Sequence, residues 1–276
     1  MNSRTMKVIT ALAVVLFMAA ATGCTKDGGG QSKPPQPSDF IPQKNKKYVY
    51  KVETDNGSPA TATQYISGQE DSSGITIYNL RTEIKAKGET ITLNDKIFST
   101  GGKTYTEIKV PDAWYQTVTM LGLMPDVKVT KAEVFGYPAY LTMENVLKEG
   151  SKIAASGPDE QGQRIEYAIG GQPASVVQYM RQVPGTATVE TVKVAAGSFI
   201  CSKFVYKVVT LIETKYGEAQ NNSYGNDDIT LWVAHGIGVV KQESKSDLMS
   251  FVPLPTGEIR IVTTNTASVT TLQNIN

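Results

Sequence analysis

Histidine and cysteine are scarce in this sequence of 276 residues, which has one histidine, His235, and two cysteines, Cys24 and Cys201. A zinc site built on several histidines or several thiolates is therefore excluded. A Ser-His-Asp triad would have to use His235, and no Gly-x-Ser-x-Gly motif is present to supply its serine. His235 precedes Gly236-Ile237-Gly238, a pattern typical of a turn. We therefore expect no enzyme, no metal and no cofactor; a catalytic role would need His235 in a cleft beside a carboxylate and a nucleophile.

The sequence also lacks a marked excess of either charge, with 27 basic and 26 acidic residues. Basic residues do not cluster among aromatic ones, so we expect no nucleic-acid partner. The glycines form neither a P-loop nor a dinucleotide-binding motif. Acidic residues gather at Asp227-Asp228 and Glu218, within the predicted loop Gly217–Asp228. A calcium site or a carboxylate pair is conceivable there, but the spacing matches no known calcium loop and favours a polar hairpin loop.

No apolar run is long enough to cross a membrane, which takes about 20 residues. The longest run, Val8–Ala21, follows the basic residues Arg4 and Lys7, as in a signal peptide. It leads into Ala21-Thr22-Gly23-Cys24, which resembles the lipobox of bacterial lipoproteins. We predict that residues 1–23 are a signal peptide and that the mature chain begins at a lipid-modified Cys24. The alternative is an ordinary signal peptide followed by a coincidental cysteine.

Residues 24–39 are expected to form the lipidated cysteine and a tether that is rich in glycine and then in proline. So few apolar side chains cannot support a folded segment. An acylated Cys24 would hold the protein on a membrane of the bacterial cell envelope. Thr25 follows the cysteine in place of aspartate, which by resemblance to enterobacterial sorting signals indicates the outer membrane. The sequence does not distinguish the periplasmic face of that membrane from its external face.

Residues 40–276 are predicted to form one β-rich globular domain, with possible halves 40–150 and 163–276. Short segments rich in Val, Ile, Thr and Tyr alternate with turn residues such as Thr100-Gly101-Gly102 and Pro184-Gly185. The predicted strands are Tyr48–Thr54, Ile75–Ala86, Thr104–Val110, Pro138–Met143, Arg164–Ile169, Thr186–Ala195, Phe199–Tyr216, Ile229–Ala234, Val239–Ser244 and Glu258–Thr264.

The segment Phe199–Tyr216 is long for a strand in a flat sheet. Its alternation places Ile200 and Phe204 on the buried face, and its length indicates a strongly curved strand. The predicted fold class is therefore all-β, a curved antiparallel sheet, half-barrel or barrel-like, with one or two short packing helices. Cys201 lies in this strand and is expected to be a small packing residue, the alternative being a reactive thiol.

Two segments have helical signals. One begins at Pro111-Asp112 and ends near Gly122, and the other, Ala174–Gln182, follows a proline. In the first helix Trp114, Val118 and Leu121 share one face at positions i, i+4 and i+7. The possible apolar contact surface comprises Trp114, Tyr115, Val118, Met120, Leu121 and Met124. It would be either a lid that meets an acyl chain or a partner, or a helix that packs as ordinary core.

Three patches resemble a known group of exported proteins. They are the opening Asp39–Tyr50, the strand-turn-strand segment Val192–Cys201, and the hairpin Leu231–Lys241. All three resemble the TapB-like exported domains and related domains of unknown function, although Asn45 and Tyr48-Val49 stand where those domains usually have Gly-x-x-Trp. This resemblance implies a curved antiparallel sheet on an exported protein, and it implies no catalytic residues.

Together these features predict a lipid-anchored envelope lipoprotein with a non-enzymatic β-domain that binds an apolar ligand or an envelope component. Its partners would be the membrane, through acylated Cys24, and a lipid or an envelope protein. The alternative is a structural or assembly partner in an envelope protein complex; a hydrolase is the third hypothesis.

Overall fold

The computed structural model describes residues 38–276 except 56, 111 and 254–258. Fourteen strands and one helix make up this part of the chain. The elements are β1 Tyr48–Thr54, β2 Ala60–Ser72, β3 Ile75–Ala86, β4 Glu89–Thr100, β5 Lys103–Ile108, α2 Asp112–Gly122, β6 Val127–Phe135, β7 Ala139–Glu144, β8 Lys152–Ser156, β9 Gln161–Ile169, β10 Gln172–Val194, β11 Gly197–Tyr216, β12 Ala219–Ala234, β13 Gly238–Pro253 and β14 Ile259–Ile275. The predicted signal peptide, Cys24 and nearly all of the tether lie outside the described residues.

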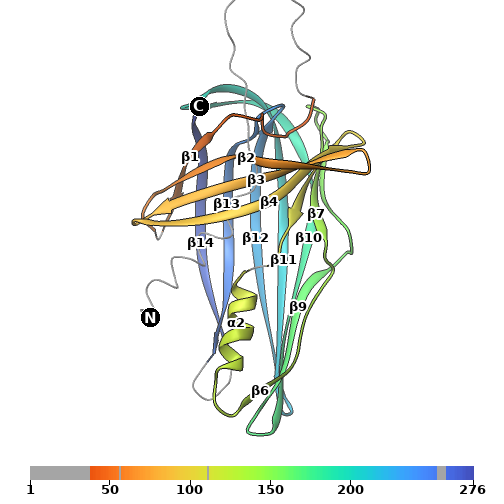
Figure 1. Ribbon diagram of the computed structural model, residues 1–276, viewed down its shortest axis with the longest axis vertical. Coiled ribbons are helices and arrows are strands. Elements are labelled where there is room, and N and C mark those ends of the chain that lie inside the picture. The colour runs from red at the N-terminus through yellow and green to blue at the C-terminus, as the bar shows by residue number, and fades with distance from the viewer. Residues whose placement is uncertain (1–37, 56, 111, 254–258) are drawn as a thin grey trace, which may run out of the picture.

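All the strands belong to one antiparallel sheet, in the order β11-β12-β13-β14-β1-β2-β3-β4-β5-β7-β8-β10-β9-β6. Because β11 also pairs with β10, twelve of these strands close into a ring, and β9 and β6 extend from β10 beyond it. The long strands run the length of the molecule, while β2, β3 and β4 cross them near one end (Figure 1). The predicted all-β, barrel-like fold with a short packing helix is confirmed.

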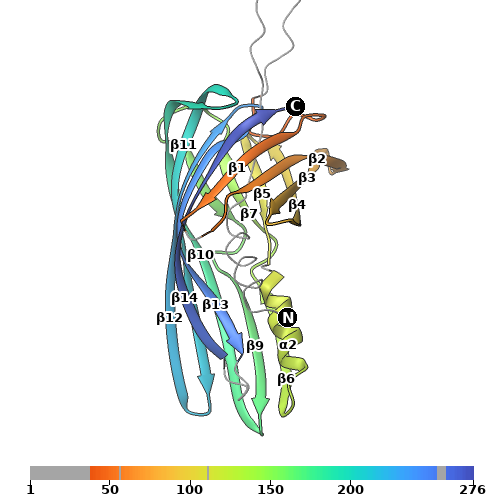
Figure 2. The ribbon, with the colours of Figure 1, turned by 90° about the vertical axis from the view of Figure 1, so that its left-hand side faces the viewer.

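The molecule therefore has two parts along its long axis. We call the end closed by the twelve strands the ring. We call the other end the open half; there the sheet ends at β6, and α2 lies across the side that no strand covers (Figure 2). Tight turns join the strands of the ring, as at Lys87-Gly88, where both residues have positive φ, 50° and 83°. Such a two-residue turn matches the twist of the strands that it connects.

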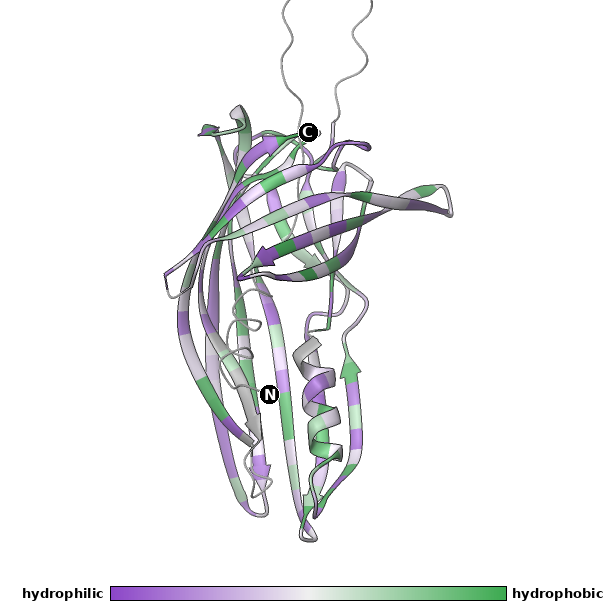
Figure 3. Cartoon of the chain, turned by 60° about the vertical axis from the view of Figure 1, so that its left-hand side comes forward, coloured by the Kyte–Doolittle hydropathy of each residue, from purple (hydrophilic) through white to green (hydrophobic). Residues whose placement is uncertain are grey.

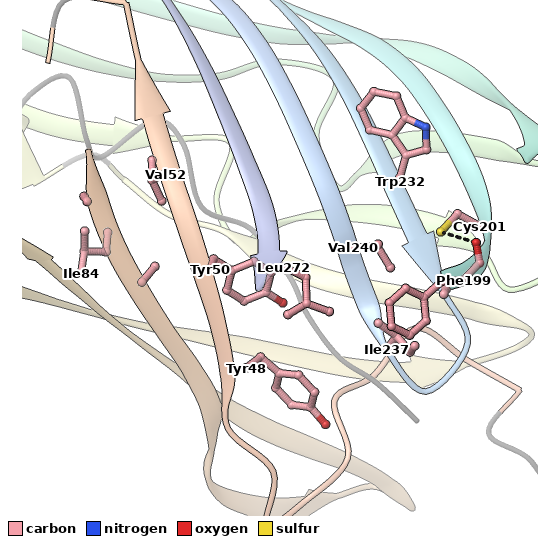
Figure 4. Close-up of a cluster of buried hydrophobic side chains, with 13 residues drawn as sticks. Tyr48, Tyr50, Val52, Ile84, Phe199, Cys201, Trp232, Ile237, Val240 and Leu272 are labelled. Carbon is pink, nitrogen blue, oxygen red and sulfur yellow. Dashed lines mark hydrogen bonds between the residues drawn. The ribbon is translucent and has the colours of Figure 1, made fainter. Parts of the chain in front are cut away.

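Apolar side chains gather in three clusters. One contains Tyr48, Tyr50, Trp232 and Leu272 (Figure 4). A second is built around Leu80, Met143 and Phe204 from strands of the ring, together with Phe40, which precedes β1. The third lies in the open half and includes Trp114, Leu121, Ile165, Tyr167, Val176 and Ile212.

Four local predictions are wrong. Ala174–Gln182 is not a helix but part of the 23-residue strand β10, because its backbone pairs with both β9 and β11. Pro184-Gly185 is not a turn between elements but lies at an irregularity within β10, where the pairing with β11 shifts between Val183 and Thr186. The predicted loop Gly217–Asp228 is mostly strand, since β12 begins at Ala219. Ile200 is 60% exposed, and its neighbours Phe199 and Cys201 are buried instead.

Candidate functional site

The helix α2 covers the open half with one apolar face. Trp114 and Leu121 are buried, with 4% and 0% of their surface exposed, and Val118 and Met124 pack against the same cluster. The opposite side of the helix faces solvent, where Tyr115 is 54% and Met120 41% exposed, and Leu123, directly after the helix, is 80% exposed. The structure therefore divides the predicted contact surface between the inside and the outside of α2.

Directly beyond the cluster that α2 covers, the same face of the sheet becomes polar. Paired residues in neighbouring strands point to the same side of a sheet. Gln182 on β10 pairs with Val208, which pairs with Asp227, which pairs with Ser246 on β13. In the next row towards the ring, Tyr206 pairs with Ile229, then Ser244 and Ser268. We call Gln182, Tyr206, Asp227, Ser244, Ser246 and Ser268 the polar layer.

The polar layer lies between two apolar clusters on one face of the sheet. Along β11, whose side chains alternate with a period of two, Phe204 belongs to the ring cluster and Ile212 to the open-half cluster. Tyr206 and Val208 lie between them in the same phase. Figure 3 shows this mixture of hydrophilic and hydrophobic residues along the long strands.

Several groups of the layer are buried. Gln182, Ser244, Ser246 and Ser268 are each less than 9% exposed. The hydroxyls of Ser244 and Ser268 bond to each other at 2.8 Å. Gln182 and Ser246 differ from this pair, because neither the buried amide of Gln182 nor the buried hydroxyl of Ser246 has a hydrogen-bond partner among the described residues. A buried polar group without a partner costs about 1–3 kcal/mol.

One carboxylate dominates the electrostatics of the layer. Burial raises the pKa of Asp227, the nearby hydroxyl of Ser246 opposes this rise, and the charges of Asp247 and Asp228 add to it. Burial, with a smaller contribution from the charge of Asp227, also raises the pKa of Tyr206. No lysine or arginine occupies the two paired rows that form the layer.

The other residues considered in the sequence lie elsewhere. His235 is in the turn between β12 and β13, where its Nε2 bonds to the carbonyl oxygen of Asn145 and its ring lies 5.2 Å from that of Phe40. Cys201 is buried, and burial and then the charge of Glu190 raise the pKa of its thiol to about 12. These surroundings favour structural roles for both residues. Within the described residues, no group of three His, Cys, Asp or Glu side chains could hold a metal ion.

A hollow lies on the opposite face of the open half. It has a volume of about 320 Å³ and is lined by Arg164, Glu166, Ser175, Val177, Tyr179, Glu213 and Lys215. Charges of both signs alternate around it, and Arg164 pairs with Glu133 on β6 at 3.2 Å. Because its charged side chains can pair with one another at the surface, this hollow is a weaker candidate than the polar layer.

Sequence reasoning missed the polar layer. The signal lies in the alternation of β12, where Asp227 stands in the same phase as the apolar residues Ile229, Leu231 and Val233. Because Gly217–Asp228 was predicted to be a loop, Asp227 was not assigned to either face of a strand. Among the described residues, no helix has the length and the apolar character to cross a membrane.

Comparison with known proteins gave three similar solved structures. A candidate lipoprotein from Parabacteroides distasonis is 12% identical, with a TM-score of 0.42, over 88% of this chain and 100% of that chain. A candidate exported protein with a YmcC-like fold from Bacteroides fragilis is 15% identical, with a TM-score of 0.38, over 87% of this chain and 99% of that chain. The hypothetical lipoprotein YmcC from Escherichia coli is 10% identical, with a TM-score of 0.23, over 82% and 83% of the two chains.

A search of curated proteins gave no significant match. The family model described as DUF3108-like matches residues 43–251, well over half of the chain. The protein therefore belongs to the DUF3108-like family.

Proposed function

We propose that this protein is a lipid-anchored lipoprotein of the bacterial cell envelope whose β-domain binds an amphiphilic envelope molecule without catalysing a reaction. Cys24 is the anchor, the outer membrane is the expected location, and the sequence resembles the TapB-like exported domains. Residues 24–39 would be the tether, and 40–276 the binding domain.

The observation that supports this proposal is the way in which the open half is closed. In the ring, every strand is held by backbone hydrogen bonds to two neighbours. In the open half, the apolar cluster is covered by α2, which packs on it through side chains such as Trp114 and Leu121. A helix of 11 residues is marginal without tertiary packing. Such a helix can move away and expose the cluster to an acyl chain while the strands remain paired.

The test is native mass spectrometry of the complete mature chain, in which residues 1–23 are replaced by an ordinary cleavable signal peptide and Cys24→Ser prevents acylation. The protein is purified without detergent from a bacterial periplasm. A co-purifying mass that matches an envelope amphiphile, and that is lost in Leu121→Asp, supports binding under α2. A ligand-free mass that is unchanged after incubation with envelope lipid extract contradicts it.

The anchor is tested separately in the unmodified chain. We expect the wild type to incorporate labelled palmitate and to sediment with membranes, and Cys24→Ser to do neither. Cys201→Ser is the matched control, because it removes the other cysteine and should leave acylation unchanged. Labelling that persists in Cys24→Ser would show that the anchor lies elsewhere.

The exposed side of α2 favours a second function, that of an assembly partner in an envelope complex. Tyr115, Met120 and Leu123 form an apolar surface there that the rest of the described chain does not cover. Exposed apolar surface of this kind is common at protein interfaces. Cross-linking in cells from a photoreactive residue at position 123 would capture such a partner, and a residue at exposed position 220 on β12 is the control.

A further inference from the structure

The polar layer is costly if its only role is to fill space. It interrupts two apolar clusters on one face of the sheet, and apolar side chains at the same positions would join them. Instead the layer holds a carboxylate, a phenol and an amide. Polar groups in such a place stabilise a fold only if they are hydrogen-bonded.

The bonding within the layer is incomplete in two places. Ser244 and Ser268 satisfy each other, whereas the buried hydroxyl of Ser246 has no hydrogen-bond partner among the described residues. Gln182 is 8% exposed, and its amide oxygen and nitrogen both lack a partner among the described residues. An amide offers two donor hydrogens and an acceptor oxygen, so Gln182 can bind a group that both accepts and donates hydrogen bonds.

The backbone around Gln182 also indicates a specialised position. The pairing of β10 with β11 shifts between Val183 and Thr186, directly after Gln182 and opposite Tyr206. At Gly185 a Cβ atom would overlap the Val205 carbonyl oxygen, so only glycine allows the two strands to approach this closely. Irregularities of this kind re-aim side chains and are frequent beside binding sites.

The charge of the layer restricts what it can bind. Asp227 is the only charged residue in the two paired rows, and no cation in those rows balances it. A phosphate or sulfate placed there would face a carboxylate in a water-poor environment. A hydroxyl or ammonium group would instead donate hydrogen bonds to Asp227 and to the amide oxygen of Gln182.

We infer that the polar layer binds the headgroup of the amphiphile, and that this headgroup donates hydrogen bonds through hydroxyl or ammonium groups and carries no net negative charge. The inference rests on the proposed function and deepens it: the acyl chain occupies the open-half cluster beneath α2, and the headgroup reaches Gln182 and Asp227. Hydroxyl and ammonium headgroups both donate hydrogen bonds to Asp227 and to the amide oxygen of Gln182, and only a hydroxyl can also accept one from the amide nitrogen. The experiment distinguishes them.

The test uses the complete mature chain with Cys24→Ser and three amphiphiles that share a dodecyl chain: dodecyl maltoside, dodecylammonium and dodecyl phosphate. Each is titrated below its micelle concentration and followed by calorimetry. We expect at least one of the first two to bind about tenfold or more tightly than dodecyl phosphate, because juxtaposed like charges disfavour binding. The tighter of the two identifies the headgroup class.

Two variants connect this preference to the layer. Asp227→Asn should reduce the difference in affinity between the preferred amphiphile and dodecyl phosphate. Glu213→Gln, on the opposite face of β11, should leave this difference unchanged. Gln182→Leu should lower the affinity for the preferred amphiphile about tenfold, which is a typical effect of losing a buried polar contact. Gln220→Leu, at an exposed position of β12, is its control. Thermal unfolding verifies that each variant is folded. If Gln182→Leu is not folded, Asp227→Asn alone decides the inference.

The outcomes separate the two proposals. Equal binding of all three amphiphiles, unchanged in Asp227→Asn, overturns the headgroup inference and leaves the proposed function intact. Tighter binding of dodecyl phosphate also overturns the inference alone. Failure of all three to bind contradicts both proposals.

Discussion

The ring and the open half of this molecule are closed in different ways. Backbone pairing closes the ring. Its shortest pairing joins β8 to Gly185 and Thr186 of β10. Side-chain packing of α2 closes the open half. Because backbone hydrogen bonds hold all of a strand in register whereas a helix on a sheet is held only by its apolar face, the two halves should differ in local stability. A scaffold and a movable cover can thus be made from one continuous sheet.

The largest expected effect comes from a truncation in the ring. Phe204 is fully buried and meets the ring of Phe40 edge-on at 6.3 Å. Phe204→Ala should lower the free energy of unfolding by about 3–5 kcal/mol, as is usual for a buried aromatic residue. Urea denaturation measures this loss. Tyr224→Ala, at a side chain that is 66% exposed, should change stability by less than about 0.5 kcal/mol.

A truncation in α2 should act locally. Leu121→Ala removes a fully buried side chain and should lower the stability of the helix against opening by about 2–5 kcal/mol. In hydrogen exchange, the amides of α2 should exchange faster while those of β1 and β3 in the ring keep their protection. Equal acceleration in both halves would show that they unfold as one unit and would remove the contrast between them.

The polar layer between the halves should make stability depend on pH. Because burial raises the pKa of Asp227 above its ordinary value of 3.8, the folded state holds this proton more tightly than the unfolded state does. This contribution to the free energy of unfolding therefore declines as pH rises from about 4 through the folded pKa. Asp227→Asn should lack the decline and should be more stable than the wild type at neutral pH. Parallel stability curves for the two proteins between pH 4 and 7 would contradict this.

The smallest expected effect concerns Cys201 in the ring. Its buried thiol has a pKa of about 12 and donates a weak hydrogen bond to the Phe199 carbonyl oxygen at 3.6 Å. The native protein with Cys24→Ser should therefore not react with a thiol reagent at pH 8, and urea should release one reactive thiol. Because the pKa of this thiol is higher in the folded state than in the unfolded state, the free energy of unfolding should fall between about pH 9 and 12. Cys201→Ala should lack this fall. Rapid reaction of the native thiol would show that the ring opens.

Local patterns were sufficient for much of the fold. The strand predicted at Tyr48–Thr54 coincides with β1, and the helix predicted from Asp112 ends at Gly122 as observed. Four strands, β2, β4, β6 and β8, were not predicted, because polar residues interrupt their alternation. Ala174–Gln182 was predicted as a helix since it follows a proline, and only pairing with strands on both sides makes it extended.

The candidate site depended more strongly on tertiary structure. Helical spacing alone brings Trp114, Val118 and Leu121 to one face, and the structure places all three against the open-half cluster. Gln182, Asp227 and Ser246, by contrast, come from three strands, and strand pairing brings them into one row. The alternation of β12 can indicate that Asp227 lies on the apolar face of its strand, but it does not indicate which residues share its row, because register is set by partners distant in the sequence.

What the sequence determined by itself was therefore local: the short-range alternation that makes strands, the turn residues between them, the apolar stripe of α2, and the lipobox-like ending at Cys24 that predicts a membrane anchor. What only the tertiary structure decided was long-range: that β10 and β11 close a ring, that α2 rather than a strand covers the open half, and that Gln182 and Asp227 lie in one row across the sheet. The physical reason is that local propensity depends on neighbours within a few residues, whereas burial and charge depend on which distant strands pair.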